Sequence, residues 1–176
     1  EKADLLIFDS VPSGAAALAE TQMKNGGTAV ILRNSSRESA ALLEHFGIRT
    51  RRKSVPGVQH LAMLQFEHPV LRDYLKVNAG SWFDILFFDV PHLTVPPEAS
   101  VLAAFDNGAP AILELRSGAG RLFVFAARPG REATNWQTFG NFLPFWRELA
   151  LLSVKPQKIP SELTAGASAL TLPDGT

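Results

Sequence analysis

The stretch Thr28–Leu32 (TAVIL) decides the fold, with Gly26-Gly27 before it and the polar turn RNSS (residues 33–36) after it. A short apolar, β-branched run without polar alternation is typical of a parallel strand that is buried on both faces. We therefore expect Thr28–Leu32 to lie inside a parallel sheet. In such sheets the carboxyl ends of the strands are the places where ligands bind.

The chain on either side predicts a β-α-β unit, then an antiparallel meander, then a closing helix. Apolar runs that are joined by short Gly-containing turns indicate antiparallel strands. Between Val58 and Val90 the pattern is less regular, and Pro91 is expected to close the last extended run. The expected strands lie within Ala3–Phe8, Thr28–Leu32, Val58–Phe66, Trp82–Val90, Val101–Phe105, Ala109–Leu115 and Arg121–Ala127, and the expected helices lie within Ala15–Asn25, Arg37–Phe46, Val70–Leu75 and Phe139–Leu152.

Helix-capping residues, together with glycine and proline, are expected to set the ends of these elements. Ser13 is the expected N-cap of the first helix and Gly26 its stop, and Ser35 or Ser36 is placed to cap the second helix. Pro110 is expected near a sheet edge or at a strand start. The order of elements predicts a mixed α/β sheet.

The 176 residues fit one domain with a tail, and we place the domain at residues 1–152 and a tail or linker at residues 153–176. Ala167–Leu172 could add one strand in that tail. The sequence has 17 Lys and Arg residues together and 17 Asp and Glu residues together, so its net charge does not favour binding to nucleic acid. The basic run Arg49–Lys53 is interpreted as a solvated connection between elements.

Cysteine is absent, which excludes thiol catalysis and thiolate metal sites. No apolar run approaches the roughly 20 residues that span a bilayer, so this segment is not expected to insert into a membrane. The abrupt start at Glu1-Lys2 suggests a piece of a longer protein.

Several features resemble one known pattern when they are taken in order. They are a strand ending in Asp9, the Gly26-Gly27 step, the His68-Pro69-Val70 step, the segment VLAAFDNGAPAILELRSGAGRLFVFA (101–126) and the Phe-Leu-Pro-Phe of residues 142–145. This order resembles the glutamine-amidotransferase-like domain of bacterial membrane proteins related to the aerotolerance (Bat) group, which also carry a von Willebrand factor A domain. The resemblance covers roughly Ala3 to Leu152.

This resemblance implies a three-layer, flavodoxin-like, class I amidotransferase-like sheet with a parallel core and an antiparallel hairpin extension. It also implies a soluble domain of a membrane-anchored bacterial protein, on a side of the membrane that stays open, with upstream strands outside this sequence. Active relatives carry a Gly-x-Cys-x-Gly elbow after the strand that matches Thr28–Leu32. Here RNSS stands at that position, so the enzymatic activity does not carry over.

We therefore expect a non-catalytic module that binds a partner protein, another domain of the same polypeptide or a small ligand. No nucleic-acid partner and no cofactor are expected. The crevice residues are chosen because they follow strand ends. They are Asp9, Ser10, Ser13, Arg33, Asn34, Ser35 and Arg128.

A serine hydrolase is the alternative, with Ser35 or Ser36 as nucleophile, a histidine as base and Asp9 or Asp89 as the orienting acid. Such an elbow needs small neighbours, and Arg33 is not small. No metal site is expected, because the four histidines show no ligand spacing. These are His45, His60, His68 and His92.

Overall fold

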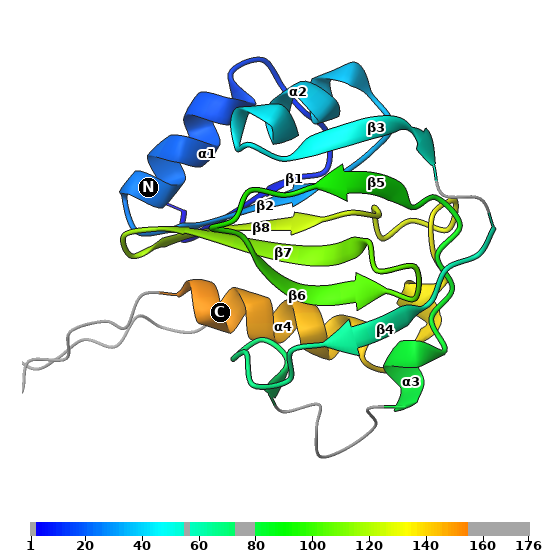
Figure 1. The fold of residues 1–176 in the computed structure, drawn as a ribbon. Helices are drawn as coiled ribbons and strands as arrows, with labels where there is room; N and C mark the ends of the chain where they lie inside the picture. The colour runs from blue at the N-terminus through cyan, green and yellow to red at the C-terminus, as the bar shows by residue number, and fades with distance from the viewer. Residues whose placement is uncertain (1–2, 55–56, 73–79, 155–176) are drawn as a thin grey trace, which may run out of the picture.

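The computed structural model describes residues 3–54, 57–72 and 80–154. Six strands form one mixed sheet in the order β1-β2-β8-β7-β6-β4, and β3 and β5 form a separate two-stranded ribbon (Figure 1). The strands are β1 (Leu5–Phe8), β2 (Thr28–Leu32), β3 (Arg49–Ser54), β4 (Leu61–Leu64), β5 (Pro91–Thr94), β6 (Ser100–Phe105), β7 (Pro110–Ser117) and β8 (Gly120–Phe125). The helices are α1 (Ala15–Lys24), α2 (Arg37–His45), α3 (Gly80–Phe83) and α4 (Phe142–Ser153), with the 3₁₀ turn η2 at Trp136–Thr138.

The expected central strand is confirmed in place and in direction. β2 lies between β1 and β8 and runs parallel to both, with Thr28 opposite Leu5 on one side and Arg121 on the other. All five of its residues are buried. A strand that is buried on both faces must be apolar throughout, and TAVIL meets that requirement.

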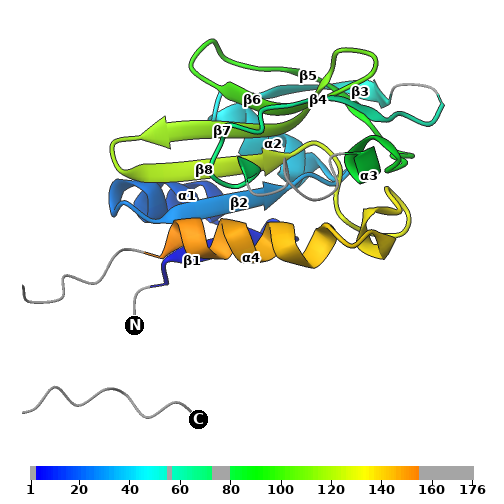
Figure 2. The same ribbon diagram turned by 90° about the horizontal axis from the view of Figure 1, so that it is seen from below.

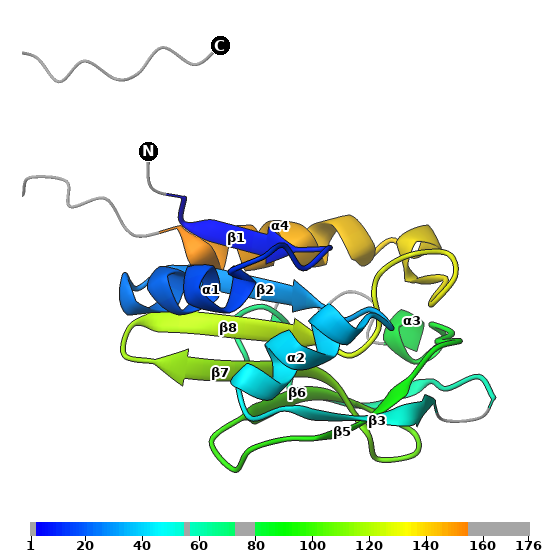
Figure 3. The ribbon, with the colours of Figure 1, turned by 90° about the horizontal axis from the view of Figure 1, so that it is seen from above.

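Helices cover both faces of the sheet. α1 and α2 lie over one face, and α4 lies across the other beneath the β1 and β2 side (Figures 1 and 3). On the first face, buried helix side chains meet Ala29 and Ile31 of β2. On the second face, Phe145 and Leu149 belong to the core that contains Val30. Successive side chains of β2 point to opposite faces of the sheet, so this one strand contributes to both cores.

The meander of β6, β7 and β8 is also confirmed. β6 pairs antiparallel with β7, and β7 pairs antiparallel with β8. Pro110 begins β7, where its missing N–H costs no ladder hydrogen bond. The turn between β7 and β8 has Gly118 at φ +59°, so the SGAG stretch is a hairpin turn.

Close packing fixes α1 against the start of β8. A Cβ atom built on Gly120 would lie 2.0 Å from the carbonyl oxygen of Met23, so only glycine fits there. At the end of α1, Gly26 adopts φ +72° and donates its N–H to Met23, as its expected role as a stop requires.

Three expectations for local structure are wrong. The N-cap position of α1 holds Gly14 at φ 79°, without a side-chain cap, in place of Ser13. Arg49–Lys53 belongs to strand β3, because β5, some 40 residues away in sequence, supplies its pairing partner (Arg49 opposite Thr94). Sequence pattern alone could not reveal that distant pairing.

The third wrong expectation is an extended run over Trp82–Val90. Trp82 lies in the helical turn α3, and within the rest of the run only Phe87 makes isolated bridges, to Gln59 and Thr134. Pro91 begins β5 and does not close a strand. Trp82 is buried against Trp136 with ring centroids 5.5 Å apart, so aromatic packing and not strand pairing explains the apolar pattern.

The remaining expectations differ at their ends. The closing helix begins at Phe142, with Pro144 in its first turn where no N–H is needed. Val70–Arg72 forms a turn, and the rest of the short helix expected to Leu75 lies outside the described residues, as does Ala167–Leu172. Within the described ranges, no helix is both long and apolar enough to cross a membrane.

Candidate functional site

The parallel strands β1, β2 and β8 end at the same edge of the sheet, and the predicted crevice residues follow them. The N–H of Arg33 donates to the carbonyl of Phe125 at 3.0 Å, which ties the end of β2 to the end of β8. Loops that leave the sheet at this edge are therefore held close together, as expected for a ligand-binding edge.

Arg33 forms a partly buried ion pair at this edge. Its Nη1 atom lies 3.0 Å from Oδ2 of Asp89, and its side chain is 10% exposed. A guanidinium this buried is stable only with a partner, which the loop before β5 provides. Sequence reasoning proposed Asp89 as an orienting acid; the structure shows it paired with Arg33.

Arg128 and Asp9 form a second ion pair across the same edge. Arg128 Nε lies 2.7 Å from Asp9 Oδ1, and its second nitrogen donates to Oδ2 at 2.7 Å. The pair is two-pronged, but both side chains are about half exposed. Arg128 thus joins the loop after β8 to the loop after β1, and its role in binding stays a prediction.

The turn after β2 is closed by its own polar side chains. Asn34 Oδ1 accepts from the N–H of Ser36 at 2.9 Å, and the N–H of Asn34 donates to Ser39 Oγ at 3.2 Å. Ser36 Oγ accepts from the N–H of Ser39 at 3.0 Å, which makes Ser36 the N-cap of α2. Asn34 also donates from Nδ2 to the carbonyl of Asp9 at 3.4 Å.

A polar cavity of about 390 Å³ lies between the start of α2 and strand β3. A second cavity of about 390 Å³ continues along α2 and shares three of the same lining residues. We call the two together the α2–β3 groove. Its lining residues are Arg33, Asn34, Ser35, Ser36, Arg37, Ala40, Ala41, Glu44, Arg49, Thr50 and Arg51.

Some of the crevice residues chosen from the sequence line this groove, and others do not. Arg33, Asn34 and Ser35 line it, as expected for the end of β2. Ser10 and Ser13 are exposed on the loop after β1 and are not among its lining residues. The basic residues of β3 were missed, because their approach to α2 depends on the pairing of β3 with β5.

The histidines lie away from the serines. His45 pairs with Glu20 at 2.8 Å, and His60 lies 3.1 Å from the carbonyl of Phe83. In the part of the chain that the structure describes, no histidine makes a hydrogen bond to Ser35 or Ser36, and no group of three His, Asp or Glu residues could hold a metal ion.

Sequence reasoning also missed a buried charged cluster toward the amino end of β8. Glu114 on β7 is 2% exposed and lies 2.9 Å from both Arg116 Nε and Arg121 Nη1. His68 Nε2 lies 3.5 Å from Glu114 Oε2, an electrostatic contact longer than a good hydrogen bond. We call these four residues the Glu114 cluster. Its signal in the sequence is one acidic residue inside the apolar strand AILEL.

The surroundings of Glu114 set its charge. Burial by itself would raise the pKa of Glu114, but the neighbouring His68 and Arg116 outweigh it and lower the pKa to about 2. The N–H of Val70 donates to His68 Nδ1 at 3.3 Å, whereas the buried Nε2 atom of His68 faces Glu114 without a hydrogen bond. The cluster is therefore built around a buried, charged carboxylate, with the Arg116 side chain reaching the surface.

No family model matches the chain, and no curated protein matches it. Among solved structures, it is similar to Cytoplasmic Protein STM1381 from Salmonella typhimurium LT2, with a TM-score of 0.65 and 13% identity over 86% of this chain and 72% of that chain. It is also similar to Cytoplasmic Protein STM3548 from Salmonella typhimurium, with a TM-score of 0.60 and 12% identity over 84% of this chain and 69% of that one.

A third similar structure is a much longer protein. The β-galactosidase from Rahnella sp. R3 matches with a TM-score of 0.52 and 15% identity over 85% of this chain but 21% of the galactosidase. At identities this low, these likenesses concern the fold alone.

Proposed function

We propose that this chain is a non-catalytic, amidotransferase-like module that binds a small ligand or a partner protein at the carboxyl edge of its parallel strands, within a larger, membrane-anchored bacterial protein. The main support for this proposal is the turn after β2. At the position where active relatives mount a nucleophile, Arg33 is paired with Asp89, and Ser36 is used to cap α2.

The fold supports the proposed family at a general level. Three adjacent parallel strands, helices on both faces and an antiparallel extension through β7, β6 and β4 are compatible with a flavodoxin-like, amidotransferase-like arrangement. The Rahnella galactosidase offers a case in which a similar fold makes up about a fifth of a longer chain. The membrane anchor rests on the sequence resemblance.

The side of the molecule formed by β1 and α4 supports contact with another domain of the same polypeptide. β1 is an edge strand of the sheet, with Ile7 44% exposed, and α4 lies beside it (Figures 2 and 3). Leu143 and Leu151 of α4 are exposed at 74% and 52%. Apolar side chains that are exposed near an unpaired strand edge favour a covering partner.

A serine-directed fluorophosphonate probe tests the absence of catalysis. We expect no labelling of the purified protein, because a hydroxyl is activated only by an adjacent base. The matched variants Ser35→Ala and Ser36→Ala identify the site if labelling occurs. Labelling that either substitution abolishes would replace this proposal with the serine hydrolase alternative.

Amide chemical-shift mapping with a library of neutral and charged small molecules tests the binding role. We expect the shifts caused by binders to gather at residues 33–40 and around Arg128. Shifts that gather at the amino end of the sheet, or binders that perturb no residue of the carboxyl edge, would contradict the proposed site.

A further inference from the structure

We propose that the α2–β3 groove binds the phosphate group of a small phosphorylated molecule that carries at least two negative charges. This inference names the ligand class of the site in the proposed function and rests on that function. Four arginines from three separate segments line the groove, and Glu44 at its far end is its single acidic lining residue among those described.

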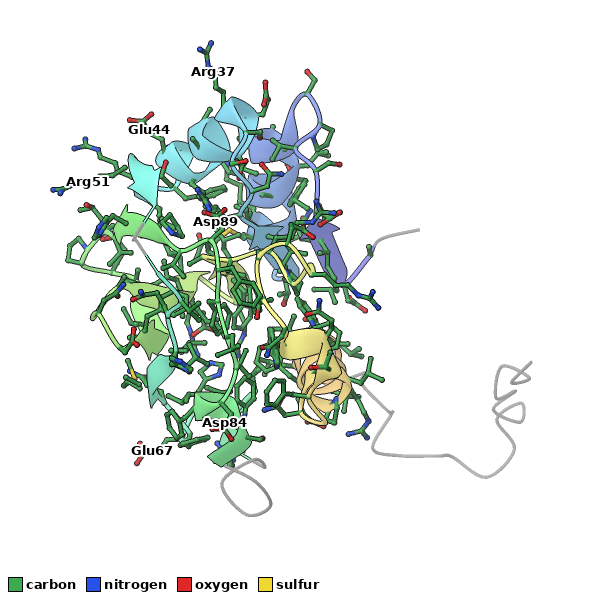
Figure 4. The ribbon with its side chains drawn as sticks, turned by 90° about the vertical axis from the view of Figure 1, so that its right-hand side faces the viewer. Arg37, Glu44, Arg51, Glu67, Asp84 and Asp89 are labelled. Carbon is green, nitrogen blue, oxygen red and sulfur yellow. The ribbon has the colours of Figure 1, made fainter. Side chains whose placement is uncertain are left out.

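The charges of the groove are unevenly neutralised. Arg33 is paired with Asp89, but Arg37, Arg49 and Arg51 form no ion pair with any described residue. Arg37 and Arg51 are exposed, and Figure 4 shows them extending outward in different directions, Arg37 from α2 and Arg51 from β3, with Glu44 between them in that view. Their long side chains can therefore turn onto a ligand without first breaking a salt bridge.

Polar groups at the end of the groove beside the start of α2, which we call the near end, complement those arginines. The first-turn N–H groups of a helix lack acceptors within the helix, and at the start of α2 the side chain of Ser36 accepts from the N–H of Ser39. Ser35 is exposed and lines the cavity beside Arg37. A tetrahedral phosphate can accept from guanidinium, hydroxyl and peptide N–H donors together, which a single carboxylate does less well.

The size of the groove indicates a ligand larger than a free phosphate ion. Each of its two cavities measures about 390 Å³, which falls within the roughly 300–1,000 Å³ of small-molecule sites. The near cavity holds the anionic group beside Arg37 and Arg51. The far cavity, which passes Ala41 and Glu44, has room for the rest of the molecule.

Titration calorimetry with inorganic pyrophosphate tests the inference, with citrate as a carboxylate anion of similar charge. We expect pyrophosphate to bind about tenfold tighter than citrate or more, and to shift the amide signals of residues 34–40 and 50–51. The variant R37Q/R51Q is expected to weaken pyrophosphate binding about tenfold or more. The matched control R147Q changes an exposed arginine on α4 and is expected to leave binding unchanged.

Three outcomes would overturn the inference. They are equal affinity for citrate, equal loss of binding in R147Q and R37Q/R51Q, and pyrophosphate shifts away from the groove. If neutral library members map to residues 33–40 while pyrophosphate does not, the phosphate inference fails and the proposed binding function stands. If no probe maps to the carboxyl edge, both fail.

Discussion

The two charged regions of this molecule, the Glu114 cluster and the α2–β3 groove, differ in how completely their charges are paired. In the Glu114 cluster a buried carboxylate meets Arg116, Arg121 and His68, and its pKa is lowered to about 2. In the groove, Arg37, Arg49 and Arg51 form no ion pair within the described part of the chain. We therefore expect the cluster to contribute to stability, whereas the groove keeps the arginines on which the proposed binding depends.

The same comparison can be made for the groups that catalysis would need. A catalytic group needs a neighbouring acid or base that activates it, and it must open onto a cleft that can hold the substrate. Glu114 and His68 have partners but do not line the α2–β3 groove, and Ser35 lines the groove but has no base beside it among the described residues.

The largest expected effect comes from removing the centre of the Glu114 cluster. Glu114→Ala leaves the partly buried Arg121 without its counter-charge and removes the carboxylate beside His68. Breaking a buried pair in this way costs about 3 kcal/mol or more of the free energy of unfolding. Urea denaturation measures the loss, and the control Glu98→Ala, at an exposed position, is expected to stay within about 0.5 kcal/mol of wild type. Equal effects of the two substitutions would show that the cluster is not structural.

The pH dependence of stability sharpens the same contrast. The pKa of Glu114 falls from 4.5 to about 2 on folding, so its charged form is stabilised in the folded state. Its contribution is fully present above pH 4.5 and is lost as the pH falls through 2. We expect the stability difference between wild type and Glu114→Gln to shrink by up to about 3 kcal/mol as the pH falls from about 5 to 2. Denaturation curves collected from pH 7 to 2 measure it, and a difference independent of pH would contradict the paired carboxylate.

Local patterns predicted the parallel core and the meander because the relevant signals lie inside each element. TAVIL specifies a buried strand, and Ser36, Gly26 and Pro110 take the cap, stop and strand-start roles expected of them. These signals depend on neighbours a few residues away, so a single sequence carries them.

The missed features depend on contacts between distant segments. β3 forms because β5 pairs with it, and the basic side of the groove is formed by β3 approaching α2. Glu114 is stable in the core because Arg121, on the next strand, and His68, from a distant turn, lie beside it. A sequence can flag an acidic residue in an apolar strand, but it does not name the partners.

The cap of α2 gives an effect of intermediate size and uses two adjacent serines as a matched pair. Ser36→Ala removes the acceptor for the N–H of Ser39 and is expected to cost about 1 kcal/mol. Ser35→Ala removes an exposed hydroxyl and is expected to change stability by less than about 0.5 kcal/mol. Thermal unfolding of both variants measures the difference. If Ser35→Ala proves the more costly, the assignment of Ser36 as the cap is wrong.

The smallest expected effect concerns the two ion pairs at the carboxyl edge, which test how far exposure weakens a charge pair. A double-mutant cycle on Asp9 and Arg128 is expected to give a coupling energy below about 1 kcal/mol, because both side chains are about half exposed despite their 2.7 Å contacts. The coupling should fall further at 1 M salt, where the Debye length is about 3 Å. The same cycle on Arg33 and Asp89 should give the larger and less salt-sensitive value, because the Arg33 side chain is 10% exposed. If the exposed pair couples more strongly and resists salt, the edge is held together by Asp9 and Arg128. In that case the exposure of a charged side chain would not indicate whether it contributes to stability or is available for binding.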